Sequence, residues 1–83
     1  MEWYLYIVRC KDGSFYTGIT TSIIRRIKEH NNKIGAKAVR GKLPAVLAYK
    51  EEYKTQQEAA KRERGIKGWR KEKKESLINK GLS

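Results

Sequence analysis

The sequence contains few of the residues that mark secreted or membrane-spanning proteins. Cys10 is the single cysteine among 83 residues, so an internal disulfide is excluded, no disulfide-linked partner is expected, and a reducing compartment is favoured. The longest apolar run, residues 3–8, is far shorter than the ~20 residues that a membrane span needs. Met1 is followed directly by Glu2 rather than by a basic stretch and an apolar segment, so no signal peptide is expected. We therefore predict a cytoplasmic protein without a membrane partner.

Acidic residues are also scarce. Nine Asp and Glu accompany 20 Lys and Arg, which gives a formal net charge of +11 and favours a polyanionic partner, with nucleic acid, and DNA in particular, as the first candidate. Residues 25–42 contain seven basic residues and one acid, whereas the segment after Glu51 mixes both signs, as on ordinary solvated helices. The candidate phosphate-binding residues are Arg25, Lys37, Arg40 and Lys42. For the last three, a purely solubilising role is an equally good interpretation.

The chain is close to the lower length limit for a self-sufficient core, and we expect one domain over residues 1–83. Alternating apolar residues predict a strand over residues 3–9, and Asp12-Gly13 predicts a hairpin turn into a second strand over residues 14–17. Pro44 introduces a third strand over residues 45–53.

Three helices complete the pattern. Thr21 or Ser22 can cap a helix that runs to about residue 32, with Ile23, Ile24 and Ile27 on its buried side. Thr55-x-x-Glu58 is a capping box that opens a second helix, whose apolar positions are Ala59, Ala60, Ile66 and Trp69. A third helix over residues 70–79 should stop at Gly81. The predicted fold is α+β, a small three-stranded antiparallel sheet flanked by helices in the order ββαβαα.

The length of the hairpin loop decides which tyrosines share a face. A loop of Lys11, Asp12 and Gly13, with a left-handed glycine, places Tyr6 opposite Gly18 and makes Tyr6 and Tyr16 diagonal neighbours roughly 7–8 Å apart. A two-residue turn would place the tyrosines on opposite faces. We favour the three-residue loop, in which Gly18 leaves open space opposite the Tyr6 ring.

Three further polar residues occupy notable helical positions. Arg26 and His30 are four residues apart and lie on one helix face. Glu63 shares the inward stripe of Ala59 and Ile66, where an acid is expensive unless it pairs with a cation, binds a metal or faces a cleft. Each residue also has an ordinary explanation: a surface arginine, a histidine near a helix C-terminus, a salt bridge for Glu63, and core packing for the tyrosines.

Taken together, these residues resemble the site of the GIY-YIG nuclease superfamily, and the chain is most similar to its small stand-alone bacterial members. The resemblance runs through LYIVRC, DGSFYTGIT, IIRRIKEHN, GAKAVRGKLPAVLAY and EAAKRERGIKGW. YLY stands where the family name has Gly-Ile-Tyr, and YTG stands for Tyr-Ile-Gly. The residues that carry the resemblance are Tyr6, Tyr16, Gly18, Arg26, His30 and Glu63. Family members with a well-developed site add an asparagine from the last helix, for which Asn79 is the one late candidate.

The resemblance implies metal-dependent hydrolysis of DNA phosphodiester bonds with low sequence specificity, in DNA repair or processing. Such hydrolysis needs a deprotonated water in line with the leaving oxygen and neutralisation of the added charge. A tyrosine can act as the base when nearby positive charge lowers its pKa. The sequence leaves open which tyrosine is the base, and we favour Tyr6, with Tyr16 orienting the water or phosphate. We further expect Arg26 to grip a phosphate oxygen, His30 to share proton transfer, and Glu63 to hold one divalent cation, with Mg²⁺ favoured over Mn²⁺. A non-catalytic nucleic-acid-binding module on the same scaffold is the alternative, and a basic adaptor for a protein or RNA partner ranks third.

Overall fold

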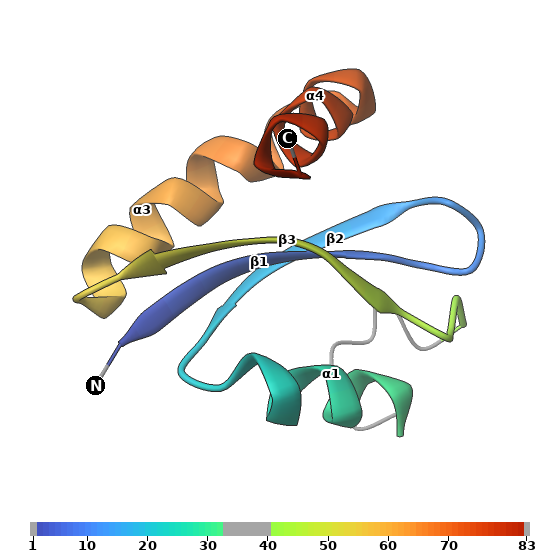
Figure 1. The fold of residues 1–83 in the computed structure, drawn as a ribbon, viewed down its shortest axis with the longest axis horizontal. Coiled ribbons are helices and arrows are strands. Elements are labelled where there is room, and N and C mark those ends of the chain that lie inside the picture. Colours follow the sequence, from blue (N-terminus) through green and yellow to red (C-terminus); the bar gives the residue numbers. More distant parts are fainter. Residues whose placement is uncertain (1, 33–40, 83) are drawn as a thin grey trace.

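The sheet has β1 in its centre. A computed structural model of the chain describes residues 2–32 and 41–82, and its strands β1 (Trp3–Arg9), β2 (Phe15–Thr20) and β3 (Val46–Tyr53) form one antiparallel sheet in the order β2-β1-β3. Helix α1 (Ile23–Asn31) covers one face, and helices α3 (Gln56–Lys67) and α4 (Lys71–Leu82) cover the other (Figure 1). The predicted α+β class and the order ββαβαα are confirmed.

The hairpin between β1 and β2 has the predicted register. Tyr6 pairs with Gly18 and Val8 pairs with Tyr16. The amide of Cys10 donates to the carbonyl of Ser14 over 2.8 Å, which leaves a three-residue loop in which Gly13 has a φ of 86°. Only glycine adopts that left-handed angle without steric penalty, so the Asp12-Gly13 signal fixes which side chains of β1 and β2 share a face.

Because β1 is central, it is buried on both faces. On the α1 side, Tyr6 and Val8 pack against Ile23 and Ile27. On the other side, the core contains Leu5, Ile7, Ile66 and Ile78, so that α3 and α4 each contribute one fully buried isoleucine. Full burial of such a side chain stabilises the fold by about 1.5–3 kcal/mol. These two cores hold α1 and α3 against opposite faces of one strand.

Two helix starts were predicted correctly. The Ser22 hydroxyl accepts a hydrogen bond from the amide of Arg25 at the start of α1. The Thr55 hydroxyl accepts one from the amide of Glu58 over 3.2 Å at the start of α3. These side chains satisfy amides that have no partner within their own helix.

Two details of the helices differ from the prediction. Ile24 is 73% exposed rather than buried, because the inward stripe of α1 follows Ile23, Ile27 and His30 at intervals of four and three residues. Helix α4 also continues through Gly81 instead of stopping there. A Cβ atom at Gly81 would lie 2.8 Å from Cε1 of Tyr49, so this glycine allows α4 to approach β3 closely.

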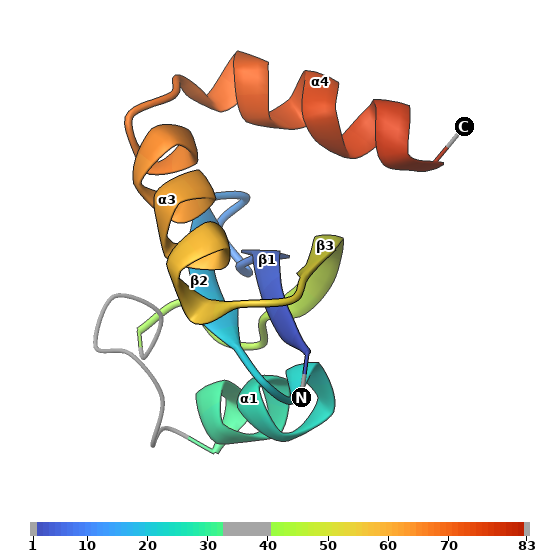
Figure 2. The same cartoon turned by 90° about the vertical axis from the view of Figure 1, so that its left-hand side faces the viewer.

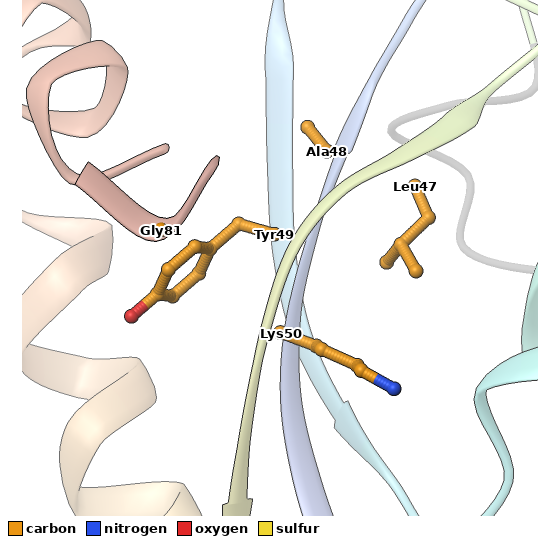
Figure 3. A pocket seen from close by; sticks show the side chains of 5 residues that line it. All are labelled: Leu47, Ala48, Tyr49, Lys50 and Gly81. Atoms are coloured by element: carbon orange, nitrogen blue, oxygen red, sulfur yellow. The ribbon is translucent and has the colours of Figure 1, made fainter. Parts of the chain in front are cut away.

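A hollow of about 480 Å³ lies between β3 and the end of α4. Figure 3 shows Tyr49 pointing toward Gly81, with Leu47 and Lys50 on the other side of the strand. None of the predicted site residues lines this hollow. Among the described residues, no helix is both long enough and apolar enough to cross a membrane.

Candidate active site

A buried tyrosine and a buried histidine form the centre of the candidate site. Tyr6 comes from β1 and is 1% exposed, while His30 comes from the last turn of α1 and is 0% exposed. The Tyr6 hydroxyl lies 3.0 Å from Nε2 of His30. The sequence predicted both residues, and the packing of α1 on the sheet brings them together.

The end of α1 is held in place by the residue after the histidine. The Asn31 side chain donates from Nδ2 to the carbonyl of Ala45 over 3.1 Å, and its Oδ1 accepts from the Ala45 amide over 2.8 Å. This pair of bonds ties the end of α1 to the start of β3. Asn31 was not recognised from the sequence, because its partner lies 14 residues further along the chain.

Arg26 completes the hydrogen bonding of the Tyr6 hydroxyl. Its Nε donates to the hydroxyl over 3.3 Å, and its Nη1 lies 3.3 Å from Oε1 of Glu29. A guanidinium group can only donate, so the Tyr6 oxygen is the acceptor in this bond. Arg26 therefore bonds to both Tyr6 and Glu29 rather than lying free on the helix surface.

Tyr16 lies beside the other two rings, on the face that the register predicts. Its ring centroid is 6.4 Å from that of Tyr6 and 5.4 Å from that of His30, the latter in an edge-on arrangement at 69°. Tyr16 is only half-buried. We call Tyr6, Tyr16 and His30 the ring cluster, of which Tyr16 is the least buried member.

Gly18 is needed because the Tyr6 ring lies directly on its backbone. A Cβ atom at this position would be 2.6 Å from the Tyr6 hydroxyl oxygen and 2.8 Å from its Cζ. The space that Gly18 was expected to leave open is therefore filled by the Tyr6 ring. A glycine in the strand is explained by this close approach.

Burial dominates the titration of both central groups. It raises the pKa of the Tyr6 hydroxyl, and although the hydrogen bond and charge of Arg26 act in the opposite direction, the net shift is upward. The charge of Arg26 alone is therefore not enough to bring this pKa below its ordinary value. Burial, and then the charge of Arg26, lower the pKa of His30, which is consequently neutral near pH 7.

Glu63 lies at the edge of the ring cluster, on α3. Its side chain is 19% exposed, and Oε2 lies 3.3 Å from Nζ of Lys67, one helical turn later. The same ammonium group is 6.0 Å from the centroid of the Tyr16 ring. The negative charge of Glu63 also contributes to the raised pKa of Tyr6, after burial. The salt bridge considered as the ordinary explanation of Glu63 is present, beside the site.

The donor groups limit which metal this site could hold. No three His, Cys, Asp or Glu side chains gather at one point in the described ranges. The described residues therefore do not provide a complete set of protein ligands for a metal ion. Mg²⁺ commonly binds one or two carboxylates and takes its other ligands from water and substrate phosphate, so a single Glu63 carboxylate fits that mode.

The predicted phosphate-binding residues are spread around the site. Arg25 is exposed and lines, together with Arg26 and Glu29, a shallow hollow of about 240 Å³. Lys42 is exposed, with Nζ 3.9 Å from Oδ2 of Asp12 in the hairpin loop. Lys37 and Arg40 lie outside the described residues. Asn79 is exposed on α4, on the sheet face opposite α1, and does not join the ring cluster (Figure 1).

Besides Asn31, two charged residues of the site region were missed from the sequence. Glu29 follows Arg26 by three positions and Lys67 follows Glu63 by four, so both are spaced for pairing on one helix face. The spacing could have identified both pairs. Which of the many Lys and Arg residues lies against Tyr16 depends on the packing of α3 and could not be read from the spacing alone.

Comparisons with known proteins agree over nearly the whole chain. The sequence model of the GIY-YIG catalytic domain matches residues 2–76. A UPF0213 protein of Staphylococcus saprophyticus is 49% identical over 78 residues, which are 94% of this chain and 95% of that protein. A UPF0213 protein of Desulfotalea psychrophila is 46% identical over 85 residues, covering 98% of this chain and 77% of that protein.

Two solved structures are similar in fold as well. The solution NMR structure of a UPF0213 protein from Bacillus halodurans has a TM-score of 0.63 and 44% identity, and covers 98% of this chain and 87% of that chain. The solution NMR structure of a protein from E. faecalis has a TM-score of 0.65 and 37% identity, with coverages of 100% and 90%. The first of these structures has the same UPF0213 designation as the two sequence relatives.

Proposed function

The chain belongs to the GIY-YIG family as a small nuclease-type domain of the UPF0213 group, and from this premise we propose that it hydrolyses DNA phosphodiester bonds. The observation that carries the proposal is the Tyr6 hydroxyl, held between Nε2 of His30 at 3.0 Å and Nε of Arg26 at 3.3 Å. We propose low sequence specificity, in DNA repair or processing, because contacts to phosphates carry no sequence information.

Tyr6 and His30 act as one proton acceptor in this proposal. The attacking water gives its proton to the Tyr6 oxygen as the Tyr6 proton passes to Nε2 of His30, whose lowered pKa keeps that nitrogen free at neutral pH. The raised pKa of Tyr6 means that a phenolate does not accumulate beforehand. Passing the proton on to His30 lets a tyrosine act as base without a permanently low pKa.

The water is placed on the Tyr16 side of the Tyr6 hydroxyl. The other directions around that oxygen are taken by His30, by Arg26 and by the backbone of Gly18. Tyr16 is half-buried and borders both rings, which suits it for orienting the water or a phosphate oxygen. Correct orientation lowers the barrier because the reactants no longer lose that freedom during the reaction.

Arg26 provides the positive charge on the α1 side. Its Nε–H group stabilises charge that develops on the Tyr6 oxygen, and the rest of its guanidinium can reach a phosphate oxygen. Its hydrogen bond to Tyr6 raises the pKa of Arg26, so the guanidinium stays charged at any working pH. Its Nη1 also pairs with Oε1 of Glu29.

Glu63 would hold one divalent cation, with Mg²⁺ preferred and Mn²⁺ as the alternative. When bound, such a cation would neutralise the extra negative charge on the phosphate in the transition state. The carboxylate is half-buried and forms an ion pair with the ammonium group of Lys67, whose Nζ lies 6.0 Å from the centroid of the Tyr16 ring, and this position supports the role.

The test is cleavage of branched, single-stranded and duplex DNA in the presence of Mg²⁺ or Mn²⁺. The wild-type chain should cut at least one of these substrates, and Arg26→Ala and Glu63→Ala should each abolish the cleavage. Lys61→Ala is the matched control, because Lys61 is exposed on α3 and should leave cleavage unchanged. Cleavage that survives both site substitutions would come from a contaminant and would contradict the proposal.

A further inference from the structure

Lys67 lies between the Glu63 carboxylate and the half-buried ring of Tyr16. Its Nζ lies 3.3 Å from Oε2 of Glu63 and 6.0 Å from the centroid of the Tyr16 ring. The side chain is 52% exposed, and exposed ion pairs at this helical spacing are weak. Its ammonium group can therefore leave Glu63 at little cost and reach a phosphate held at Tyr16.

A second lysine continues this line of positive charge from the start of α4 to the hairpin. Nζ of Lys71 would lie 3.6 Å from a Cβ atom at Gly13, in the hairpin loop, and it is 5.8 Å from the Phe15 ring. Arg9 lies over the same ring, with Cζ 5.3 Å from the centroid. Phe15 thus holds one cation from α4 and one from β1 beside the tip of the hairpin.

The two cations beside Phe15 lie against its ring rather than against carboxylates. In the described part of the chain, neither Arg9 nor Lys71 forms an ion pair with a carboxylate, and both lie against an aromatic ring instead. Residues 62–74 contain seven basic and two acidic side chains, a net charge of +5 at the turn between α3 and α4 (Figure 2). The sequence predicted an ordinary mixed helix surface for the segment after Glu51. The fold instead brings its basic part next to the hairpin and to Tyr16.

We propose that Lys67, Lys71 and Arg9 form a phosphate track that leads the DNA backbone away from the ring cluster and over the hairpin tip. The proposal rests on the proposed function, because it takes DNA as the substrate. Cations aligned with aromatic rings are a common arrangement in surfaces that follow a nucleic-acid backbone. The track reaches the same hairpin loop in which Asp12 pairs with Lys42. It does not include the predicted contact at Arg25, which lies on α1.

Glu63 and Lys67 are coupled in this arrangement. While the carboxylate holds the ammonium group, Lys67 contributes little to DNA binding. A divalent cation at Glu63 would displace the ammonium group, and so would removal of the carboxylate charge. Loading the site with metal would then make one more phosphate contact available at Tyr16.

The first test is a double-mutant cycle on this pair, read by fluorescence anisotropy of a labelled DNA oligonucleotide in the presence of a chelator. Glu63→Gln should tighten binding severalfold, because it releases Lys67 and prevents cleavage. In the Lys67→Gln background the same substitution should have little effect. An equal tightening in both backgrounds would mean that Lys67 is not the linking group and would overturn the proposal.

The second test is the salt dependence of binding in the Glu63→Gln background. Adding Lys67→Gln and Lys71→Gln should reduce the slope of log K against log salt for duplex DNA by roughly 1.8, about 0.9 for each lost phosphate contact. Lys61→Gln is the matched control, because it removes the same charge from α3 about 200° around the helix from Glu63. An equal effect of Lys61→Gln, or an unchanged slope, would overturn the track.

These outcomes separate the track from the proposed function. Wild-type protein that binds DNA through Lys67 and Lys71 but never cuts it would contradict hydrolysis and leave the track standing. Protein that cuts DNA, but whose salt slope for DNA binding does not depend on either lysine, would support hydrolysis and contradict the track. Absence of DNA binding by every variant, or tighter binding of an RNA of the same sequence, would overturn the track as a DNA surface.

Discussion

The Tyr6 hydroxyl lies 3.0 Å from Nε2 of His30, and both residues are almost completely removed from solvent. One residue comes from the central strand and the other from the last turn of the first helix. A histidine buried without a carboxylate partner is neutral at neutral pH, so this contact joins a tyrosine hydroxyl to a ready proton acceptor. This pair is the core of the proposed hydrolytic centre.

The first prediction separates the two tyrosines. Tyr6→Phe removes the oxygen that takes the proton and should slow single-turnover cleavage at saturating DNA by about 10²- to 10⁴-fold. Tyr16→Phe should slow it less, because Tyr16 orients the reactants. Both variants keep their rings and should stay folded. The assignment of Tyr6 as the base would be contradicted if Tyr6→Phe cut at the wild-type rate, or if Tyr16→Phe slowed cleavage more than Tyr6→Phe.

The second prediction concerns the pH dependence of cleavage. Burial and the charge of Arg26 lower the pKa of His30 from its ordinary value of 6.5. The acceptor nitrogen therefore stays free below pH 6.5, and the rate should fall only as the pH drops through the lowered value. In His30→Gln the rate should be low and this acid limb should disappear. An acid limb that persists in the variant would place the titrating group elsewhere.

The third prediction concerns the effect of the lowered His30 pKa on the free energy of unfolding. Below pH 6.5 the unfolded chain binds a proton at His30 that the folded chain does not yet bind, so the free energy of unfolding should decrease as the pH falls from 6.5 to the lowered pKa. Above pH 6.5 the contribution is constant. Urea unfolding across this range should show the decrease in the wild type, and His30→Gln should remove it.

The fourth prediction concerns Gly18. Gly18→Ala places a methyl group 2.6 Å from the Tyr6 hydroxyl oxygen and should destabilise the protein by about 1–3 kcal/mol in urea unfolding. Tyr6→Phe should partly relieve this loss, because it removes the atom that would lie nearest. Gly65→Ala is the matched control, because no atom outside its own stretch of helix lies within 4 Å of a Cβ at Gly65. Alanine in place of glycine in a helix should stabilise the protein by about 0.5–1 kcal/mol. Strictly additive effects at positions 6 and 18 would contradict the contact.

The fifth prediction tests a polar cluster that holds α3 on the sheet. Glu51 receives hydrogen bonds from Arg62 over 3.1 and 3.2 Å and from the hydroxyls of Tyr49 and Tyr53. Burial and the bond to Glu51 raise the pKa of each tyrosine to about 12. Glu51→Gln removes the negative charge, so both pKa values should fall toward 10 in a titration followed by tyrosine NMR signals. Unchanged values would show that burial alone causes the shift.

Local signals in the sequence predicted the parts of the site that depend on neighbouring residues. Asp12-Gly13 determines the loop, the loop determines the register, and the register places Tyr6 and Tyr16 on one face. The caps at Ser22 and Thr55 likewise need only the residues that follow them. These predictions succeeded because the interactions that decide them span a few residues.

Features that depend on packing between distant segments could not be predicted in the same way. The upward shift of the Tyr6 pKa results from burial under α1, which exceeds the effect of Arg26. The continuation of α4 through Gly81 depends on the Tyr49 ring on β3. The place of Lys67 beside Tyr16 depends on how α3 lies against β2. Each of these is fixed by tertiary contacts rather than by local propensity.

The central claim is that residues from the sheet, α1 and α3 form one site for the cation and the DNA backbone. Backbone amide NMR shifts, followed during titration with Mg²⁺ and then with a DNA oligonucleotide, test it most directly. The account predicts that Mg²⁺ shifts the amides around Glu63 and Tyr16, and that DNA shifts these together with Tyr6 and Arg26. Shifts confined to other surfaces, such as the hollow between β3 and α4, would contradict it.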